Sequence, residues 1–244
     1  MLIINADDWG RSREETDRAA ACCLNGRVTS VSAMVFMQDS ERAAELAKQH
    51  DLDVGLHLNF GENFTGDGML WQLAQQQARI VRFLNFSKFA LVLYHPFLRR
   101  QFRAVYEAQM EEFLRLYGKP PTHVDGHKHF HLCTNVLMGG VLPPGLRVRR
   151  NFTFLASDKG WLQRTYRKLA DQSLAKKSIL TDALYSLQYA LKHGLMGRVA
   201  NLAKKSCVEL MTHPLYAPEY DFLMGDVFQE MFAGVKLGRF DQNR

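Results

Sequence analysis

The sequence predicts an α/β protein whose strands form a mainly parallel sheet or barrel. Short apolar runs typical of buried strands alternate with segments of helical periodicity, as repeated strand-then-helix units require. Polar residues also fall at or just beyond the ends of the predicted strands, where such folds place their active sites. These residues are Asp7, Asp8, His57, His127 and His213. Because 47% of the 244 residues are hydrophobic and no linker interrupts them, we expect a single domain over residues 1–244.

The chain opens with a predicted strand and a predicted helix. Residues 2–6 form a short apolar run, which indicates a buried strand. Residues 12–24 are expected to form a helix, because Ser12 followed three residues later by Glu15 is a capping-box pattern. Gly26 is expected to end this helix.

The next segments continue the alternation. Residues 29–36 are β-branched and apolar and predict a second strand, and residues 39–50 predict a second helix. A third strand is expected over residues 53–58 and carries His57 near its end. Residues 61–70 are rich in Gly and Asn and predict a loop over the site.

The second half of the chain begins with its clearest helix, over residues 101–117, where apolar residues recur near 3.6-residue spacing. A pair of prolines ends that helix, and a histidine-rich segment follows. Further along, we expect a short strand at 147–149, mostly helical structure over 161–205 and a late strand over 206–211.

Charge and cysteine content limit the class of protein. The net charge of +6 is spread along the chain in pairs of basic residues, without a long basic tract, so no nucleic-acid partner is expected. The four cysteines form no CxxC pair, which favours a reducing compartment.

The termini and apolar segments indicate where the protein resides. The chain starts directly with a strand and has no basic region before it, so no signal peptide is expected. Residues 84–98 are apolar but contain Lys88, His95 and Pro96 and are shorter than the ~20 residues of a membrane span. We therefore expect a cytoplasmic protein without stable membrane insertion. Its oligomeric state is left open.

The histidine-rich segment over residues 123–131 holds the most specific pattern of the chain. His123, Asp125, His127, His129 and His131 alternate, so an extended segment would place all five on one face. Same-face neighbours on a strand lie about 7 Å apart, so a single ion with bonds of about 2 Å can bind only one or two of them. Further ligands must come from elsewhere in the chain.

Asp7 and Asp8 are the first candidates for chemistry. Two adjacent carboxylates leaving a strand point in different directions, so one can bind a metal while the other acts as a general base. An acidic pair also suits a helix N-terminus. His57 alone resembles a core histidine, and His213 alone fits a surface turn. Together, one Asp and two His with open positions have the composition of a hydrolytic metal site.

Four motifs together resemble those of the YdjC-like carbohydrate deacetylases, the chitooligosaccharide deacetylase family. The motifs are Asn5-Ala6-Asp7-Asp8-Trp9-Gly10, Gly55-Leu56-His57-Leu58, the segment from Thr122 to His131, and Glu209-Leu210-Met211-Thr212-His213-Pro214. Their order and spacing agree from Leu2 to about Phe240. Trp9 stands where the family often has Phe, and Lys128 stands where some members have histidine.

The resemblance implies a distorted (β/α) barrel related to the polysaccharide deacetylases, and removal of an N-acetyl group from an amino sugar. It further implies that Asp8, His57 and His127 hold one divalent cation. Asp7 would be the general base and His213 the general acid. Magnesium and zinc both suit this donor set, so the metal is left open.

The resemblance implies supporting roles for the other polar residues of the histidine-rich segment. His123, Asp125, His129 and His131 would support the metal ligands or line the substrate cleft. His129 and His131 are also rivals of His213 for the role of acid. Residues 61–105 match the family poorly, so the sugar or glycolipid that is the substrate is left open.

Two other functions are kept as alternatives. The same site could hydrolyse another amide or a phosphoester, and Arg149 and Arg150 would then be the candidate phosphate donors. The protein could also be a non-catalytic relative that binds a metal or a sugar.

Overall fold

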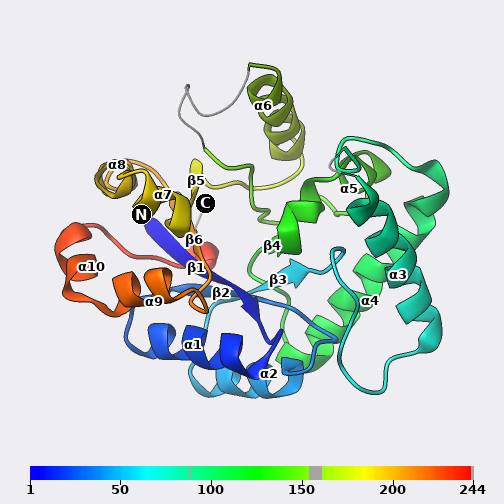
Figure 1. The fold of residues 1–244 in the computed structure, drawn as a ribbon, viewed down its shortest axis with the longest axis horizontal. Helices are drawn as coiled ribbons and strands as arrows, with labels where there is room; N and C mark the ends of the chain where they lie inside the picture. The colour runs from blue at the N-terminus through cyan, green and yellow to red at the C-terminus, as the bar shows by residue number, and fades with distance from the viewer. Residues whose placement is uncertain (88, 154–160, 243–244) are drawn as a thin grey trace.

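The computed structural model describes residues 1–87, 89–153 and 161–242 and shows an α/β fold, as predicted. Six parallel strands form one curled sheet in the order β4-β3-β2-β1-β6-β5 (Figure 1). The strands are β1 (Leu2–Trp9), β2 (Ser30–Ala33), β3 (Val54–Leu58), β4 (Val124–Gly126), β5 (Ala183–Ser186) and β6 (Val208–Thr212).

Helices surround the sheet on its outer side (Figure 1). The α-helices are α1 (Arg13–Leu24), α2 (Ser40–Gln49), α3 (Trp71–Phe86), α4 (Arg99–Tyr117), α5 (Thr134–Gly139), α6 (Trp161–Ala175), α7 (Leu187–Lys192), α8 (Met196–Ala203), α9 (Ala217–Met224) and α10 (Asp226–Met231). Three short 3₁₀ helices are η1 (Pro96–Leu98), η2 (His127–Leu132) and η3 (Phe240–Gln242). Among the described helices, none has an apolar stretch long enough to cross a membrane.

The central strand β1 separates an apolar outer layer from a polar interior. All eight of its residues are buried. Leu2, Ile4 and Ala6 belong to the hydrophobic core beneath the helices. Asn5 and Asp7 point to the other face, where the Asn5 amide donates to Asp7 at 2.9 Å. The concave side of the sheet is therefore lined by polar groups that must satisfy one another.

The predicted ends of two helices are confirmed. Ser12 caps α1, because its hydroxyl accepts from the Glu15 backbone N–H and donates to the Glu15 carboxylate at 2.8 Å. The main chain turns at Gly26, which has a φ of +66°. Helix α4 ends at Gly118, with a φ of +69°, just before the two prolines.

Two sequence-based boundaries are wrong. The mostly helical segment predicted over 161–205 is interrupted by β5, whose apolar residues Ala183, Leu184 and Tyr185 are buried beside β6. The strand predicted over 29–36 ends at Ala33, and Phe36 has a φ of +59°, which is incompatible with an extended strand.

The histidine-rich segment is extended only as far as Gly126. Lys128 and His129 adopt left-handed conformations, with φ of +54° and +57°, and the chain turns into η2. This turn brings His131 back against Gly126, where a Cβ atom would stand 3.0 Å from the His131 ring. The prediction that five alternating side chains share one face is therefore wrong beyond Gly126.

The predicted strand at 147–149 extends the sheet beyond β4. Val148 forms a parallel bridge with Val124, and Arg147 forms one with Ile179. The Arg149 N–H donates to the Val124 carbonyl at 3.0 Å. This pairing carries the Arg149 side chain into the polar interior of the sheet.

Candidate active site

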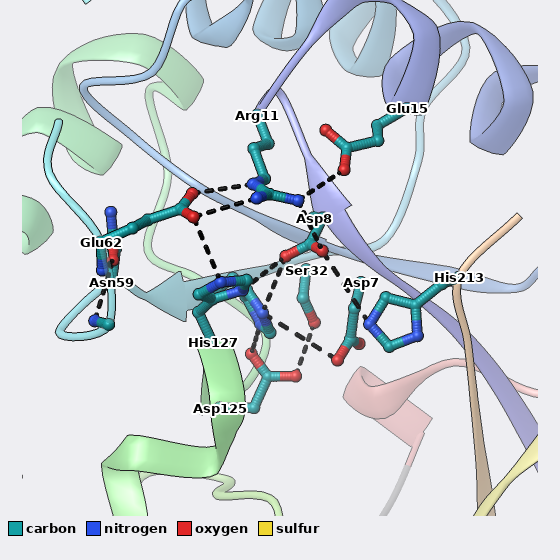
Figure 2. A network of polar contacts seen from close by, with 12 residues as sticks. Asp7, Asp8, Arg11, Glu15, Ser32, Asn59, Glu62, Asp125, His127 and His213 are labelled. Carbon is teal, nitrogen blue, oxygen red and sulfur yellow. Dashed lines mark hydrogen bonds and ion pairs between the residues drawn. The ribbon is translucent and has the colours of Figure 1, made fainter. Parts of the chain in front are cut away.

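The carboxyl ends of the parallel strands bring distant polar residues together (Figure 2). Asp7 and Asp8 come from β1, His57 from β3, and His127 directly follows β4. His213 follows β6. Because parallel strands end at the same edge of a sheet, residues far apart in sequence meet here.

Two imidazole nitrogens converge on one carboxylate oxygen. His127 Nδ1 lies 2.9 Å and His57 Nε2 lies 3.4 Å from Oδ1 of Asp8. Donors that share an ion at about 2.0–2.2 Å stand about 3–3.5 Å apart, so this spacing suits a metal site. Asp8 has a left-handed backbone with a φ of +64°, a conformation that is unusual for a non-glycine residue.

His57 is oriented by Asp125. The Asp125 carboxylate lies 2.7 Å from Nδ1 of His57, which turns Nε2 toward Asp8. A carboxylate behind a liganding histidine is a common support in metal sites. Burial alone would lower the pKa of His57, but the charges of Asp125 and Asp7 outweigh burial and raise it to about 10.

Asp8 stays ionised in this setting. Burial favours its neutral form, but the hydrogen bonds from His127 and His57 outweigh burial and hold the Asp8 pKa well below its usual range. The pKa of His127 is raised, because its contacts with Asp8 and Glu62 outweigh the effect of burial. The carboxylates of this cluster therefore favour positive charge at the two histidines, which a cation bound there could supply instead.

Asp7 faces a different partner. Arg149 donates two hydrogen bonds to the Asp7 carboxylate, at 2.6 and 2.7 Å. Oδ2 of Asp7 also lies 4.0 Å from Nε2 of His57. A bidentate arginine fixes the plane of a carboxylate, so Asp7 is held beside the Asp8 cluster with a fixed orientation.

Arg149 is completely buried and bridges three carboxylates. Besides Asp7, it contacts Asp125 at 2.7 Å and Glu209 at 2.6 Å. Burial opposes its charge, but the three carboxylates outweigh burial and raise its pKa well above its ordinary value. With no open face, Arg149 does not act as the phosphate donor considered from the sequence, and Arg150 lines a separate cavity.

A cavity of about 570 Å³ opens above the cluster. Asp7, Asp8, His127 and His213 line it. Its other lining residues are Arg11, Glu15, Lys128, Ser186, Gln188, Met211, Pro214, Leu215 and Tyr216. Nε2 of His213 lies 3.9 Å from Oδ2 of Asp8.

A charged pair at the mouth was not predicted from the sequence. Arg11 binds Glu62 through two hydrogen bonds, at 2.8 and 3.0 Å (Figure 2). Oε2 of Glu62 lies 3.5 Å from Nε2 of His127. The predicted loop over residues 61–70 thus contributes a carboxylate to the edge of the site.

Three histidines of the histidine-rich segment lie away from the cavity. His123 is buried, stacked on Phe240 with ring centroids 3.6 Å apart, and contacts the Ser32 hydroxyl. His131 is buried with Nε2 3.0 Å from the Arg149 carbonyl. His129 packs its ring edge-on to Phe152. None of the three lines the cleft.

Two of the groups that hold the site together are only weakly indicated by the sequence. Arg149 and Glu209 lie within predicted strands, where a buried charge is unexpected. For Glu209, a charged residue inside an otherwise apolar strand was the sign that could have identified it, whereas the predicted strand of Arg149 also holds Arg147 and gives no such sign. Which carboxylate each would contact depends on strand order, which the sequence does not state.

The chain was compared with known proteins. The sequence profile of the YdjC-like protein family matches residues 1–234. A mouse protein named carbohydrate deacetylase is 30% identical over 213 residues, which cover 84% of this chain and 66% of that protein. A Proteus mirabilis protein named chitooligosaccharide deacetylase is 27% identical over 251 residues, which cover 95% of this chain and 87% of that protein.

A solved structure shares the fold. It is a proposed cellobiose-phosphate cleavage protein from Enterococcus faecalis, with a TM-score of 0.71 and 18% sequence identity. The match covers 98% of this chain and 97% of that one. At this identity the likeness shows the fold alone.

Proposed function

The chain belongs to the YdjC-like protein family, and from this membership and the site geometry we propose that it is a metal-dependent carbohydrate deacetylase. Its reaction would be hydrolysis of the acetyl–nitrogen bond of an N-acetylated amino sugar. The names of the mouse and Proteus mirabilis relatives support the reaction class. The observation that carries the proposal is the convergence of Asp8, His57 and His127 beside a separately held Asp7.

The residues present fit a divalent cation. Asp8, His57 and His127 each offer one donor atom, and the three atoms lie within 4.8 Å of one another. Nδ1 of His127 and Nε2 of His57 both lie within 3.4 Å of Oδ1 of Asp8. One carboxylate and two imidazoles suit zinc, and magnesium or manganese with water in the open positions. The cation would polarise the acetyl carbonyl and acidify a water molecule.

A second set of donors, Asp7, His57 and Asp125, is also close enough for a metal. Arg149 already binds both carboxylates of this set, at 2.6–2.7 Å. A guanidinium and a divalent cation would repel each other at that distance. The set therefore acts as an ion-pair cluster, and the cation belongs with Asp8.

Asp7 would act as the general base. It borders the cavity, and its orientation is fixed by Arg149, so it can accept a proton from a water molecule that attacks the acetyl carbon. Asp8 is assigned the other role because its Oδ1 lies within 3.4 Å of nitrogens of both His57 and His127, where the cation would be held. The two neighbouring aspartates thus divide the work, one holding the cation and one moving a proton.

His213 would act as the general acid. It lines the cavity, whereas the rival acids His129 and His131 do not. Its backbone N–H donates to Glu219 at 2.8 Å, which fixes the turn after β6. Protonation of the departing nitrogen releases the amine, while acetate takes the oxygen of the attacking water.

The cellular setting is part of the proposal. All four cysteines are free, and we place the enzyme in the reducing cytoplasm.

The proposal is tested by measuring acetate and free amine together. The purified protein is stripped of metal, reloaded with zinc or magnesium, and incubated with N-acetylglucosamine and its oligomers. We expect one acetate for each amine released, only in metal-loaded samples. Bound metal at one ion per chain without acetate from any member of the panel would refute the proposal.

A further inference from the structure

The segment over residues 86–97 exposes an unusual amount of apolar surface. Of the fifteen large apolar side chains that are exposed in the described parts of the chain, six lie within these twelve residues. They are Phe86, Phe89, Val92, Leu93, Tyr94 and Phe97, and we call them the apolar patch. Phe86 is 87% exposed and Phe97 is 84% exposed. Six exposed large apolar side chains within one short segment indicate an interaction surface.

The sequence around the apolar patch contains no acidic residue. From Gly68 to Tyr106 there is no Asp or Glu, although 25 of the 244 residues are acidic. The same stretch carries Arg79, Arg82, Lys88, Arg99, Arg100 and Arg103. All five arginines are exposed. All charged residues within this stretch of sequence are therefore basic.

The apolar patch is anchored to the folded frame. The backbone of His95 exchanges two hydrogen bonds with the Asn135 side chain, at 2.9 and 2.8 Å. The Thr134 N–H donates to the Leu91 carbonyl at 2.9 Å. Ala90 and Leu98 are buried beneath the segment. The exposed rings therefore face outward from a packed support, and their exposure does not come from local unfolding.

The charge distinguishes between possible partners. In a symmetric dimer the same patch faces itself, so the arginines of one copy would lie against those of the other, and the stretch from Gly68 to Tyr106 holds no carboxylate to compensate them. An anionic bilayer surface satisfies both features at once. Its headgroups attract arginine, and its acyl boundary accepts aromatic and aliphatic side chains.

We propose that the apolar patch and its arginine border dock this protein onto the surface of an anionic lipid bilayer. The contact is peripheral, because the described helices include none that could span a membrane. Trp71 and Leu70, at the other end of α3, are also exposed and lie in the same acid-free stretch. This inference goes beyond the proposed function and does not depend on the chemistry of the cavity.

The test is vesicle flotation of the full chain. Vesicles of phosphatidylcholine alone are compared with vesicles that also contain phosphatidylglycerol. We expect the protein to float with the anionic vesicles at low salt, to be released as salt rises, and to stay behind with the neutral vesicles. Absence of binding to anionic vesicles at low salt would overturn the proposal and would leave an acidic protein surface as the alternative partner.

Two pairs of variants test which residues carry the binding. Arg82→Glu with Arg100→Glu is matched by Lys204→Glu with Lys205→Glu, which changes the net charge equally on another exposed surface. Phe86→Ser with Phe97→Ser is matched by Leu24→Ser with Val227→Ser, which are exposed elsewhere. Each patch variant should weaken vesicle binding at least about tenfold relative to its matched control.

The outcomes are separable from failure of the deacetylase proposal. All variants are assayed for folding by circular dichroism and for acetate release from a soluble oligosaccharide without vesicles. If patch variants and controls bind vesicles equally, the docking proposal is wrong even where acetate is released. If light scattering shows a dimer that Phe86→Ser with Phe97→Ser dissociates, the patch is an interface between copies and the docking proposal is also wrong.

Discussion

The surroundings of Asp7 and Asp8 differ sharply, although the two residues are adjacent on β1. Both border the cavity, but Asp7 is bound by Arg149, which joins it to two more carboxylates in a buried ion-pair cluster. Asp8 faces the cavity and meets two histidines. The left-handed backbone at Asp8 accompanies this division. Two identical side chains thus acquire different chemistry because they point in different directions at the end of the strand.

The histidines show the same contrast. In the interior, burial lowers the pKa of His123 and of His131 to about 4. Beside Asp8, burial also opposes the charged form, but the neighbouring carboxylates outweigh burial, so that the pKa of His57 is raised to about 10 and that of His127 is also raised. The interior therefore favours neutral rings that complete a fixed hydrogen-bond network. The cavity edge favours positive charge, which a metal ion can replace.

The largest effect should follow from removing the base without disturbing the metal. Asp7→Asn keeps the shape of the side chain but cannot accept the proton, so we expect turnover to fall by about 10³–10⁴-fold. Metal content, measured by atomic emission, should stay at the wild-type value. Asp8→Asn is the matched variant and should lose metal. Metal loss in Asp7→Asn would contradict the proposal that Asp8 binds the metal and Asp7 only accepts the proton.

Removing the interior cation should cost stability. Arg149→Met leaves three buried carboxylates without their partner, so the free energy of unfolding should fall by about 3–5 kcal/mol in urea titrations. Adding Glu209→Gln removes one of the carboxylates and should restore part of the loss. Wild-type stability in Arg149→Met would mean that the interior cluster is not held by this charge.

The proposed acid should affect turnover alone. His213→Gln removes the proton donor at the cavity, and we expect turnover to fall by about 10²-fold with metal content unchanged. His50→Gln, on an exposed helix end, is the control. If His131→Gln lowers turnover as much as His213→Gln without loss of stability, the acid has been assigned wrongly.

The support of His57 by Asp125 can be weakened while the three proposed metal ligands remain. Asp125→Asn keeps an oxygen near Nδ1 of His57 but removes its charge, so metal affinity should fall by about 10–100-fold. Ser32→Ala, which removes one hydrogen bond to Asp125, should have a smaller effect. Competition with a chelator measures both. An unchanged metal affinity in Asp125→Asn would show that the charge of Asp125 does not support His57 and acts only in the ion pair with Arg149.

The pKa shifts of His131 and His57 have opposite signs, so the two residues should change the free energy of unfolding of the metal-free protein in opposite directions as pH rises. Because His131 is neutral when folded, only the unfolded chain takes up its proton between pH 6.5 and about 4. Stability is then lost as pH falls, by about 1.4 kcal/mol per pH unit for this histidine. His57 has a raised pKa, so its contribution is present below pH 6.5 and lost as pH rises toward 10.

Urea titrations across this range measure the slope. Between about pH 4 and pH 6.5, His131→Asn should reduce the slope of the free energy of unfolding against pH by about 1.4 kcal/mol per pH unit. His50→Asn should leave this slope unchanged. If the free energy of unfolding of His131→Asn falls as steeply below pH 6.5 as that of the wild type, His131 is not held neutral in the folded protein.

Much of this comparison could be predicted from local sequence, and part could not. The carboxyl-end position of Asp7, Asp8 and His57 followed from apolar runs that end in polar residues. The course of the chain after Gly126 did not, because two left-handed non-glycine residues, Lys128 and His129, carry no local signal. Alternation alone therefore placed His129 and His131 on the wrong side.

Arg149 shows a second limit. Its residue type suggested an anion site, but its three partners come from β1, β4 and β6, and only strand order brings them together. Strand order is set by tertiary packing of non-local segments. The residues proposed to bind the cation and to react were recognisable from motifs, whereas the residues that fix their orientation could be identified only from the fold.

Gly55 limits how far such a site can be re-engineered. A Cβ atom there would stand 2.2 Å from the His123 ring, which is itself stacked on Phe240. Randomising position 55 in a library should therefore return glycine alone among folded clones. Position 55 therefore cannot be varied to change the substrate preference. Libraries should instead vary residues at the rim of the cavity.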